Sequence, residues 1–282
     1  MEAMVRGGDE SSSRSMAEDL LLPGRPSPRI AAGIRWYARR LLRRRFHAVR
    51  LARGSAEVIA PIDRSSRPTI LLLSHASWWD PILAIWIWDR FFGSRGAAGP
   101  MHRRELERFR FFRAVGMFGI DPDDPASLEA MRDYLRPRMT QGGEVLLLTP
   151  QGTLTDVRTP IRLRPGAAAM AASLEEVEVV AVAVEYAFWL DQRPEVFLRA
   201  TRCRPTAEGR LPSTADWHRA MQGAMQENAA ALASQVIARD PAAFEVLVGG
   251  ETSIHPVYDW WLRLWGRAGA IDREGRDRGG SP

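Results

Sequence analysis

The chain has 282 residues, 45% of them hydrophobic, and this length can bury the core of one large domain. Its 39 basic residues, all arginine, exceed its 34 acidic ones, and the formal net charge of +5 indicates an anionic partner such as a membrane surface, a nucleic acid or a phosphorylated cosubstrate. The absence of lysine excludes Schiff-base chemistry and a P-loop lysine, and the single cysteine, Cys203, excludes an internal disulfide and a cysteine-based zinc site.

The two ends of the chain differ in composition from the rest. Residues 1–30 and 266–282 are rich in Ser, Gly, Pro and charge, which predicts disordered tails around one domain at 31–265. The first residues lack the layout of a secretory signal, so we expect a cytoplasmic protein. The longest apolar run, residues 81–88, is too short to span a bilayer, so any membrane contact should be peripheral.

The first predicted element is an amphipathic helix over residues 34–53. At 100° per residue its apolar side consists of Ile34, Tyr37, Leu41, Leu42, Ala48, Val49 and Ala52. The pattern favours a helix that lies on anionic lipid, with Arg39, Arg40, Arg43 and Arg44 as membrane contacts. Two alternatives remain: the helix packs on the core with a solvated arginine face, or it binds RNA, for which no accompanying motif is present.

Strands and helices alternate after this helix. Apolar runs predict strands at 69–73, 144–149, 177–186 and 195–200, and helical periodicity predicts helices at 81–92, 103–115, 126–139, 165–175 and 214–238. This order indicates an α/β fold, a single domain with one mostly parallel sheet flanked by helices.

Two loops directly follow predicted strands, at 74–80 and 150–165, so both should face one crevice at the carboxyl edge of the sheet. In the first loop, Pro81 is expected to place Asp80 at the N-cap of the next helix. The turn can bring the Asp80 carboxylate against one nitrogen of His75 and leave the other nitrogen free as a base for a substrate hydroxyl. The spacing alone is weak evidence, because Asp80 can simply cap the helix while His75 is a hydrogen-bonded core residue.

The second loop contains a possible anion-binding turn. Gly152 allows the backbone to approach a ligand closely, and exposed amides with the Thr153 hydroxyl can hold an anion or an oxyanion. The alternative is an ordinary turn at the end of a strand.

Residues 55–187 resemble the glycerolipid acyltransferase family, typified by the 1-acylglycerol-3-phosphate acyltransferases. The first family block, a histidine and an aspartate separated by four residues, is similar to His75, Ser77 and Asp80. The second is similar to Arg104-Glu105-Leu106 followed by Phe112, Gly116, Gly119, Ile120 and Asp121. The third is similar to Thr149-Pro150-Gln151-Gly152-Thr153 with Arg164-Pro165-Gly166-Ala167 behind it, and the fourth is loosely similar to residues 180–184.

The resemblance implies a glycerol-3-phosphate acyltransferase-like fold and an O-acyltransferase that needs no bound cofactor and no metal. It implies that His75 is the general base, that Asp80 orients it, and that the third block binds the acceptor. Either acyl-CoA or acyl carrier protein would deliver the acyl group to a lipid hydroxyl. We therefore assign Ser77, Gln151, Gly152 and Thr153 to acceptor or donor binding, and expect no nucleic acid partner.

Two departures from the family pattern concern the acceptor. Gln151 replaces the usual glutamate, and Pro122 stands where the family commonly has an arginine thought to contact the acceptor phosphate. Arg158, Arg162 and Arg164 are candidates to bind that phosphate or the phosphates of coenzyme A. The acceptor is accordingly lysophosphatidate-like, or it is a phosphate-free glycolipid, aminolipid or carotenoid sugar.

A different class of function is a non-catalytic protein that only tethers to membranes. The retention of both members of the His–Asp pair argues against it. The absence of a Gly-x-Ser-x-Gly elbow argues against a serine hydrolase.

A tryptophan-rich segment lies near the carboxyl terminus. Trp260, Trp261 and Trp265 occur with flanking arginines, a composition typical of a membrane interface. We predict that they contact the bilayer, with core packing as the alternative. The protein is then expected at the cytoplasmic face of a membrane as a peripheral protein.

Overall fold

The computed structural model describes residues 20–249 except 64, 66, 190 and 208. Its strands are β1 (Leu21–Leu22), β2 (Ala48–Ala52), β3 (Thr69–Leu73), β4 (Ala97–His102), β5 (Met117–Ile120), β6 (Val145–Leu148), β7 (Glu178–Ala187), β8 (Glu195–Arg202) and β9 (Phe244–Gly249). Its helices are α2 (Pro28–Arg45), α3 (Ser55–Asp63), α4 (Asp80–Phe92), α5 (Arg103–Arg108), α6 (Pro125–Thr140), α7 (Gly166–Ala172) and α8 (Thr214–Ala238), with short 3-10 helices η1 (Arg110–Val115) and η2 (Pro241–Ala243). None of the helices in this part of the chain has the length and apolar character needed to cross a membrane.

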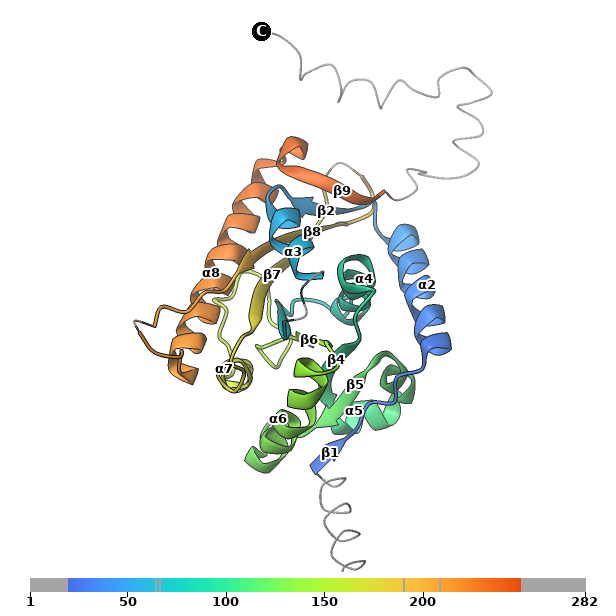
Figure 1. Ribbon diagram of the computed structural model, residues 1–282. Helices are drawn as coiled ribbons and strands as arrows, with labels where there is room; N and C mark the ends of the chain where they lie inside the picture. Colours follow the sequence, from blue (N-terminus) through green and yellow to red (C-terminus); the bar gives the residue numbers. More distant parts are fainter. Residues whose placement is uncertain (1–19, 64, 66, 190, 208, 250–282) are drawn as a thin grey trace, which may run out of the picture.

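The strands form one sheet in the order β1-β5-β4-β6-β3-β7-β8-β2-β9 (Figure 1). The pairs β4–β5, β4–β6, β3–β6, β3–β7 and β2–β8 are parallel, whereas β1–β5, β7–β8 and β2–β9 are antiparallel. The predicted α/β fold with one mostly parallel sheet flanked by helices is therefore confirmed. Because β6, β3 and β7 are parallel neighbours, the loops after them start at the same edge of the sheet.

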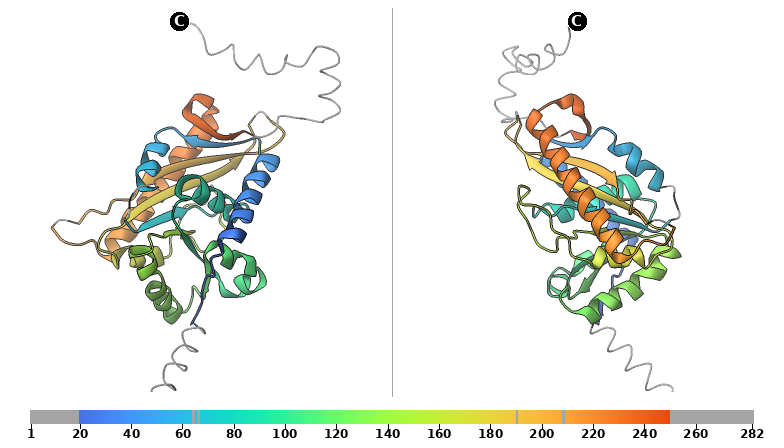
Figure 2. Two further views of the ribbon diagram at one scale, coloured as in Figure 1. Left: turned by 45° about the vertical axis from the view of Figure 1, so that its right-hand side comes forward. Right: turned by 90° about the vertical axis from the view of Figure 1, so that its left-hand side faces the viewer.

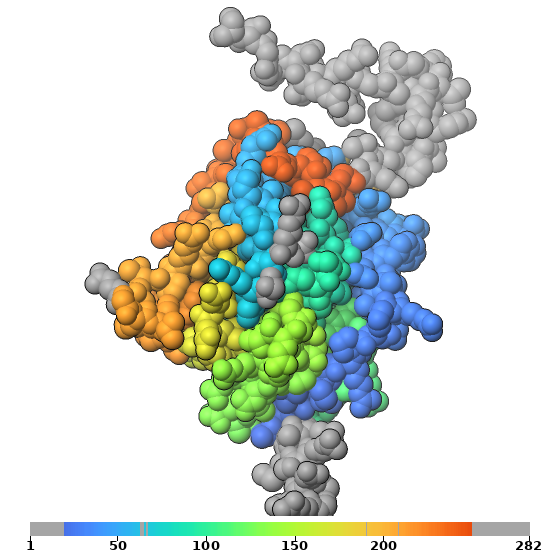
Figure 3. Space-filling model, viewed as in Figure 1, coloured from blue at the N-terminus to red at the C-terminus, as the bar shows by residue number. Residues whose placement is uncertain are grey.

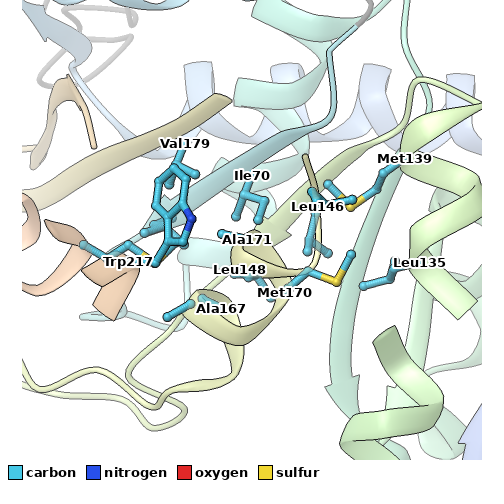
Figure 4. Packing of buried hydrophobic residues seen from close by; sticks show 14 of the residues in the cluster. Ile70, Leu135, Met139, Leu146, Leu148, Ala167, Met170, Ala171, Val179 and Trp217 are labelled. Carbon is cyan, nitrogen blue, oxygen red and sulfur yellow. The ribbon is translucent and has the colours of Figure 1, made fainter. Parts of the chain in front are cut away.

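Both faces of the sheet are covered by helices, as parallel sheets require. On one face, α6, α7 and α8 pack on Ile70, Leu72, Leu146 and Leu148 (Figure 4), and α8 runs across the strands in the right-hand view of Figure 2. On the other face, Leu71 and Leu73 of the same strand β3 belong to a core cluster with side chains from α2, α3 and α4. The side chains of β3 are fully buried on both faces, which explains why its sequence is a continuous apolar run.

The predicted helix over residues 34–53 is wrong at both ends. Helix α2 spans residues 28–45 and lies along the outer side of α4 (Figures 1 and 3), whereas residues 48–52 form β2 between β8 and β9. As a strand, this segment buries Val49 and Leu51 on one face and pairs its backbone on both sides. Long-range strand pairing thus overrides a helical pattern that is continuous in the sequence.

Residues 20–30, assigned above to a disordered tail, are ordered. Leu21 and Leu22 pair with β5, Gly24 donates its amide to the Tyr134 hydroxyl, and α2 begins at Pro28. The leucine triplet at 20–22 is too short to produce a periodic signal, and its strand forms because the edge of β5 offers hydrogen-bonding partners. The predicted tails at 1–19 and 266–282 lie outside the described residues.

Candidate active site

The loop between β3 and α4 starts as a continuation of the sheet. Ser74 donates its amide to the Val182 carbonyl at 3.1 Å, and its hydroxyl accepts from the Val184 amide at 2.8 Å. The chain leaves the sheet only at His75. The histidine is therefore held at the carboxyl edge of the sheet by β7, which extends past the end of β3.

The Asp80 carboxylate is the centre of the loop. Its Oδ2 accepts from His75 Nδ1, from the Ala76 amide and from the Ser77 amide, each at 2.8 Å. Its Oδ1 accepts from the Tyr186 hydroxyl at 2.7 Å, and the Asp80 side chain is only 1% exposed. Both oxygens of this buried carboxylate are therefore engaged by hydrogen-bond donors, as a buried polar group requires.

These contacts fix the proton on the His75 ring. An ionised carboxylate can only accept hydrogen bonds, so Nδ1 must carry the proton that it donates to Asp80, and Nε2 of the neutral ring is then an acceptor. The His75 side chain is 21% exposed, so the ring is not sealed in the core. The loop thus presents an imidazole whose second nitrogen can take a proton.

The expectation that Asp80 caps α4 is wrong. Trp79 occupies the N-cap position, and Asp80, the first helical residue, turns its carboxylate back toward the loop that precedes it. Pro81 has no amide hydrogen to satisfy at this end of the helix. The Ser77 hydroxyl accepts from the Trp79 amide at 3.2 Å, so its side chain stabilises the turn.

The loop after β6 is hydrogen-bonded to the His75 loop. Gln151 Oε1 accepts from the His75 amide, Gln151 Nε2 donates to Thr155 Oγ1, and the Thr155 amide donates to the His75 carbonyl, all at 2.8 Å. Both polar atoms of the Gln151 side chain are therefore engaged within the protein. Sequence reasoning predicted Gln151 as a ligand-binding residue and did not detect Thr155, because their link to His75 is visible only once the two loops meet.

Gly152 adopts the left-handed backbone conformation, with φ of +75°. A Cβ atom here would lie 2.7 Å from Arg164 Nε, so the absence of a side chain makes room for that guanidinium. The Gly152 amide donates to the Thr149 carbonyl, whereas Thr153 is exposed next to it. Gly152 and Thr153 of the predicted anion-binding turn are both exposed, but the Gly152 amide already has a partner.

The three candidate phosphate-binding arginines have different surroundings. Arg164 Nη1 lies 2.7 Å from Asp123 Oδ1 and 3.4 Å from the Pro122 carbonyl oxygen. Arg158 makes two hydrogen bonds to Asp156, which hold the pKa of that carboxyl well below its usual range. Arg162 is exposed. Arg164 is therefore the arginine that reaches the segment in which Pro122 replaces the arginine of the family pattern.

The arginines predicted to contact a membrane on α2 are divided between two environments. Arg39 Nε bonds to Asp89 of α4 at 2.5 Å, and this contact raises the pKa of its guanidinium. Arg40 lies over the exposed Trp36 ring, while Arg43 and Arg44 are exposed in the last turn. Arg39 thus joins α2 to α4. The predicted contacts Trp260, Trp261 and Trp265 lie outside the described residues.

The side chains of the described residues contain no group of three His, Cys, Asp or Glu residues suited to a metal ion. His102, the nearest further histidine in the sequence, is exposed and accepts from the Arg104 amide at the start of α5.

A comparison with protein-family models gives a match that includes these loops. The family described as Acyltransferase matches residues 55–185, which contain the His75 loop and the loop after β6. Residues 55–185 therefore form a domain of this acyltransferase family, and the chain is an enzyme that transfers acyl groups. No curated protein matches the chain in a search of such sequences.

Proposed function

We propose that the enzyme moves a fatty acyl group from a thioester, acyl-CoA or acyl carrier protein, onto the hydroxyl of a lipid, with His75 as general base. The observation that supports this proposal is the 2.8 Å contact between His75 Nδ1 and a buried, fully hydrogen-bonded Asp80. No nucleophilic side chain is required, because the acceptor hydroxyl is itself the nucleophile.

The step follows from the geometry of the pair. His75 Nε2 takes the proton of the acceptor hydroxyl as its oxygen attacks the thioester carbon, and Asp80 stabilises the imidazolium that forms. The C–O bond forms, the C–S bond breaks, and the departing thiolate takes the proton back from His75. The Thr153 amide and hydroxyl are the candidates to stabilise the oxyanion, and Ser77 keeps the His75 loop in shape.

A lipid-extract assay with labelled acyl-CoA, with the product identified by mass, tests the reaction. Removal of a general base typically lowers the rate by ~10² to 10⁴, so His75→Ala should fold normally and lose transfer. His102→Ala, which removes an exposed histidine elsewhere, is the matched control and should keep its activity. Full activity of the His75 variant would exclude the mechanism.

We propose Arg164 as the acceptor-phosphate contact, because its guanidinium reaches Pro122 and Asp123. Its ion pair with Asp123 is exposed, with side chains 44% and 78% exposed, so an incoming phosphate can replace that carboxylate at little cost. Arg164→Gln should raise KM for lysophosphatidate, and Arg136→Gln, an exposed change on α6, should not.

If wild-type enzyme acylates a glycolipid, an aminolipid or a carotenoid sugar but not lysophosphatidate, the acceptor is phosphate-free. In that case Arg158, Arg162 and Arg164 remain candidates for the phosphates of coenzyme A. A protein that binds lipid vesicles but transfers no acyl group to any acceptor would instead be a membrane tether.

We further propose that the protein sits peripherally on a membrane, at its cytoplasmic face, with the loops around His75 against the lipid. Three of the large apolar side chains exposed there are Trp78 at 73%, Leu154 at 57% and Phe188 at 61%. They belong to the segments that follow β3, β6 and β7, and we call them the apolar rim. Leu154 precedes Thr155, which bonds to His75, and Phe188 lies two residues after Tyr186, which bonds to Asp80.

Membrane binding through the apolar rim and membrane binding through the arginines of α2 should differ in their dependence on salt. Contacts of Arg40, Arg43 and Arg44 with anionic lipid are screened by salt, whereas insertion of apolar side chains is not. Partial burial of three such side chains is worth ~1 kcal/mol each, or roughly 100-fold in vesicle partition.

Vesicle flotation in high salt isolates the contribution of the rim. A triple variant with Trp78, Leu154 and Phe188 changed to Ala should float far less than wild type. The matched control replaces Leu211, Ile237 and Val246, which are equally exposed but lie elsewhere in the chain. Equal losses in both triple variants would contradict the proposed orientation, and binding to nucleic acid but not to vesicles would contradict membrane association altogether.

A further inference from the structure

Strand β7 places a tyrosine beside the catalytic loop. The pairing of β3 with β7 ends with Leu73 opposite Val182, so the remaining residues of β7 run alongside the loop after β3. Side chains alternate along a strand, and Val180, Val182 and Val184 face the α4 side of the sheet. The next position on that face is Tyr186, and its hydroxyl reaches Asp80 Oδ1 at 2.7 Å.

The Tyr186 ring is fixed by packing independent of this hydrogen bond. Its centroid lies 5.8 Å from that of Phe46, and Phe46 in turn packs edge-on against Trp79 at 5.0 Å. Phe46 follows the end of α2, and Trp79 precedes Asp80 in the loop. The Tyr186 ring thus packs on Phe46, which Trp79 contacts in turn, while the Tyr186 hydroxyl donates to the Asp80 carboxylate.

The Tyr186 hydroxyl makes a contact with Asp80 that no other described group makes. Asp80 Oδ2 has three donors, but Tyr186 is the donor to Oδ1 among the described residues. Donors on both oxygens prevent rotation of the carboxylate about its χ2 axis. Burial, together with the charge of Asp80, raises the pKa of the Tyr186 phenol, so it remains a donor throughout the physiological range.

We infer that Tyr186 is a positioning residue that holds the Asp80 carboxylate so that Oδ2 faces His75 Nδ1. This inference rests on the proposed role of His75 as general base, and it adds strand β7 to the loops after β3 and β6 that form the candidate site. Tyr186 acts through Asp80 and His75.

Tyr186→Phe tests the inference because it removes the hydroxyl and keeps the ring. Loss of a hydrogen bond to a charged group corresponds to a change of roughly tenfold or more in an equilibrium or rate constant, so kcat should fall by about that factor. KM should stay unchanged, because the lost group acts only through Asp80. In an Asp80→Asn background the same change should have a much smaller effect, since the two residues act as one unit.

A second readout does not depend on activity. In wild-type protein, ¹⁵N spectra of the His75 ring should show the proton on Nδ1, and in Tyr186→Phe the two tautomers should become mixed. Tyr134→Phe is the matched control, because it also removes a hydroxyl that is hydrogen-bonded, to the Gly24 amide, outside the loop. It should change neither kcat nor the His75 spectrum.

The inference is overturned if Tyr186→Phe leaves kcat within twofold of wild type with an unchanged His75 spectrum, or if Tyr134→Phe produces the same changes. His75→Ala assigns the ring signals and separately tests the proposed function. An active His75→Ala enzyme would exclude the proposed mechanism. The ¹⁵N spectrum of Tyr186→Phe would still decide whether Tyr186 positions Asp80 against His75.

Discussion

Replacement of Asp80 by asparagine tests how the loop is stabilised. The amide oxygen can take the position of Oδ2 and keep its three donors, and the amide nitrogen can donate to the Tyr186 oxygen, so the shape of the site is retained. What is lost is charge. Hydrogen bonds to charged groups contribute ~1.5–3 kcal/mol against ~0.5–1.5 for neutral ones, so three such bonds predict a loss of ~3 kcal/mol.

Thermal unfolding and acyl transfer measure the two consequences of Asp80→Asn separately. A loss of ~3 kcal/mol in a domain of this size lowers Tm by roughly 6–12 °C. The transfer rate should fall by ~10² to 10⁴, because the imidazolium of His75 loses its counter-charge. Asp80→Ala should be less stable than Asp80→Asn, since it leaves buried donors without an acceptor. Wild-type stability and rate in Asp80→Asn would refute the claim that an ionised carboxylate organises the loop.

Three further predictions concern other parts of the fold. Gly152→Ala should lower the free energy of unfolding by ~1–2 kcal/mol because of the left-handed backbone, and by a further amount because of the contact with Arg164. Gly143→Ala, at φ of +63° with open surroundings, measures the backbone contribution alone. Equal losses of Tm in the two variants would contradict the steric contact. Gln151→Ala should lower kcat by roughly tenfold through loss of the link between the two loops, and an unchanged kcat would show that the link is dispensable. Burial raises the pKa of the Cys203 thiol to about 12. The thiol of the unfolded chain ionises at a lower pH than the buried thiol of the folded chain. The contribution of Cys203 to the free energy of unfolding is therefore fully present below pH ~8.5 and is lost by ~1.4 kcal/mol per pH unit as the pH rises toward 12. Urea unfolding should therefore show a shallower alkaline decline in Cys203→Ala than in wild type, and parallel curves would contradict the burial argument.

The strands that sequence analysis predicted are those with a strong local signal. Residues 69–73 and 177–186 are apolar runs, and they appear as β3 and β7 at the centre of the sheet. Strand β4 was missed because its sequence, Ala97 to His102, contains a glycine and a proline and has no apolar alternation. It forms because β5 and β6 supply partners on both sides, and such information is absent from any short window of sequence.

The helix predicted at 103–115 illustrates a local interruption. The structure divides it into α5 and η1 at Phe109, whose ψ of 58° is not helical, and η1 ends at Gly116 in the left-handed conformation. A Cβ atom at Gly116 would lie 1.8 Å from the Ala97 carbonyl oxygen, so glycine is required where this turn meets β4. The sequence shows the glycine but not the strand that makes it necessary.

The part of the candidate site formed by residues close together in the sequence was predictable. The spacing of His75 and Asp80 after an apolar strand placed both residues on one turn, and the structure brings them into contact. Tyr186 was not predicted because its role depends on the register between β7 and β3. A signal did exist, since Tyr186 is a polar-tipped residue that continues the inward-facing series of Val182 and Val184, and such a position needs a hydrogen-bonding partner.

The contacts of Gln151 give a physical reason for a glutamine and not a glutamate at this position. The amide of this side chain accepts from the His75 amide and donates to Thr155 Oγ1, while the Thr155 hydroxyl donates to the Thr153 carbonyl at 3.1 Å. A glutamate could accept from His75, but as an ionised acceptor it would compete with the Thr153 carbonyl for the Thr155 hydroxyl. It would also add a negative charge on the loop that carries Arg164. Glutamine therefore keeps the link between the two loops, satisfies both hydroxyl contacts of Thr155, and adds no negative charge near Arg164, which pairs with the exposed Asp123.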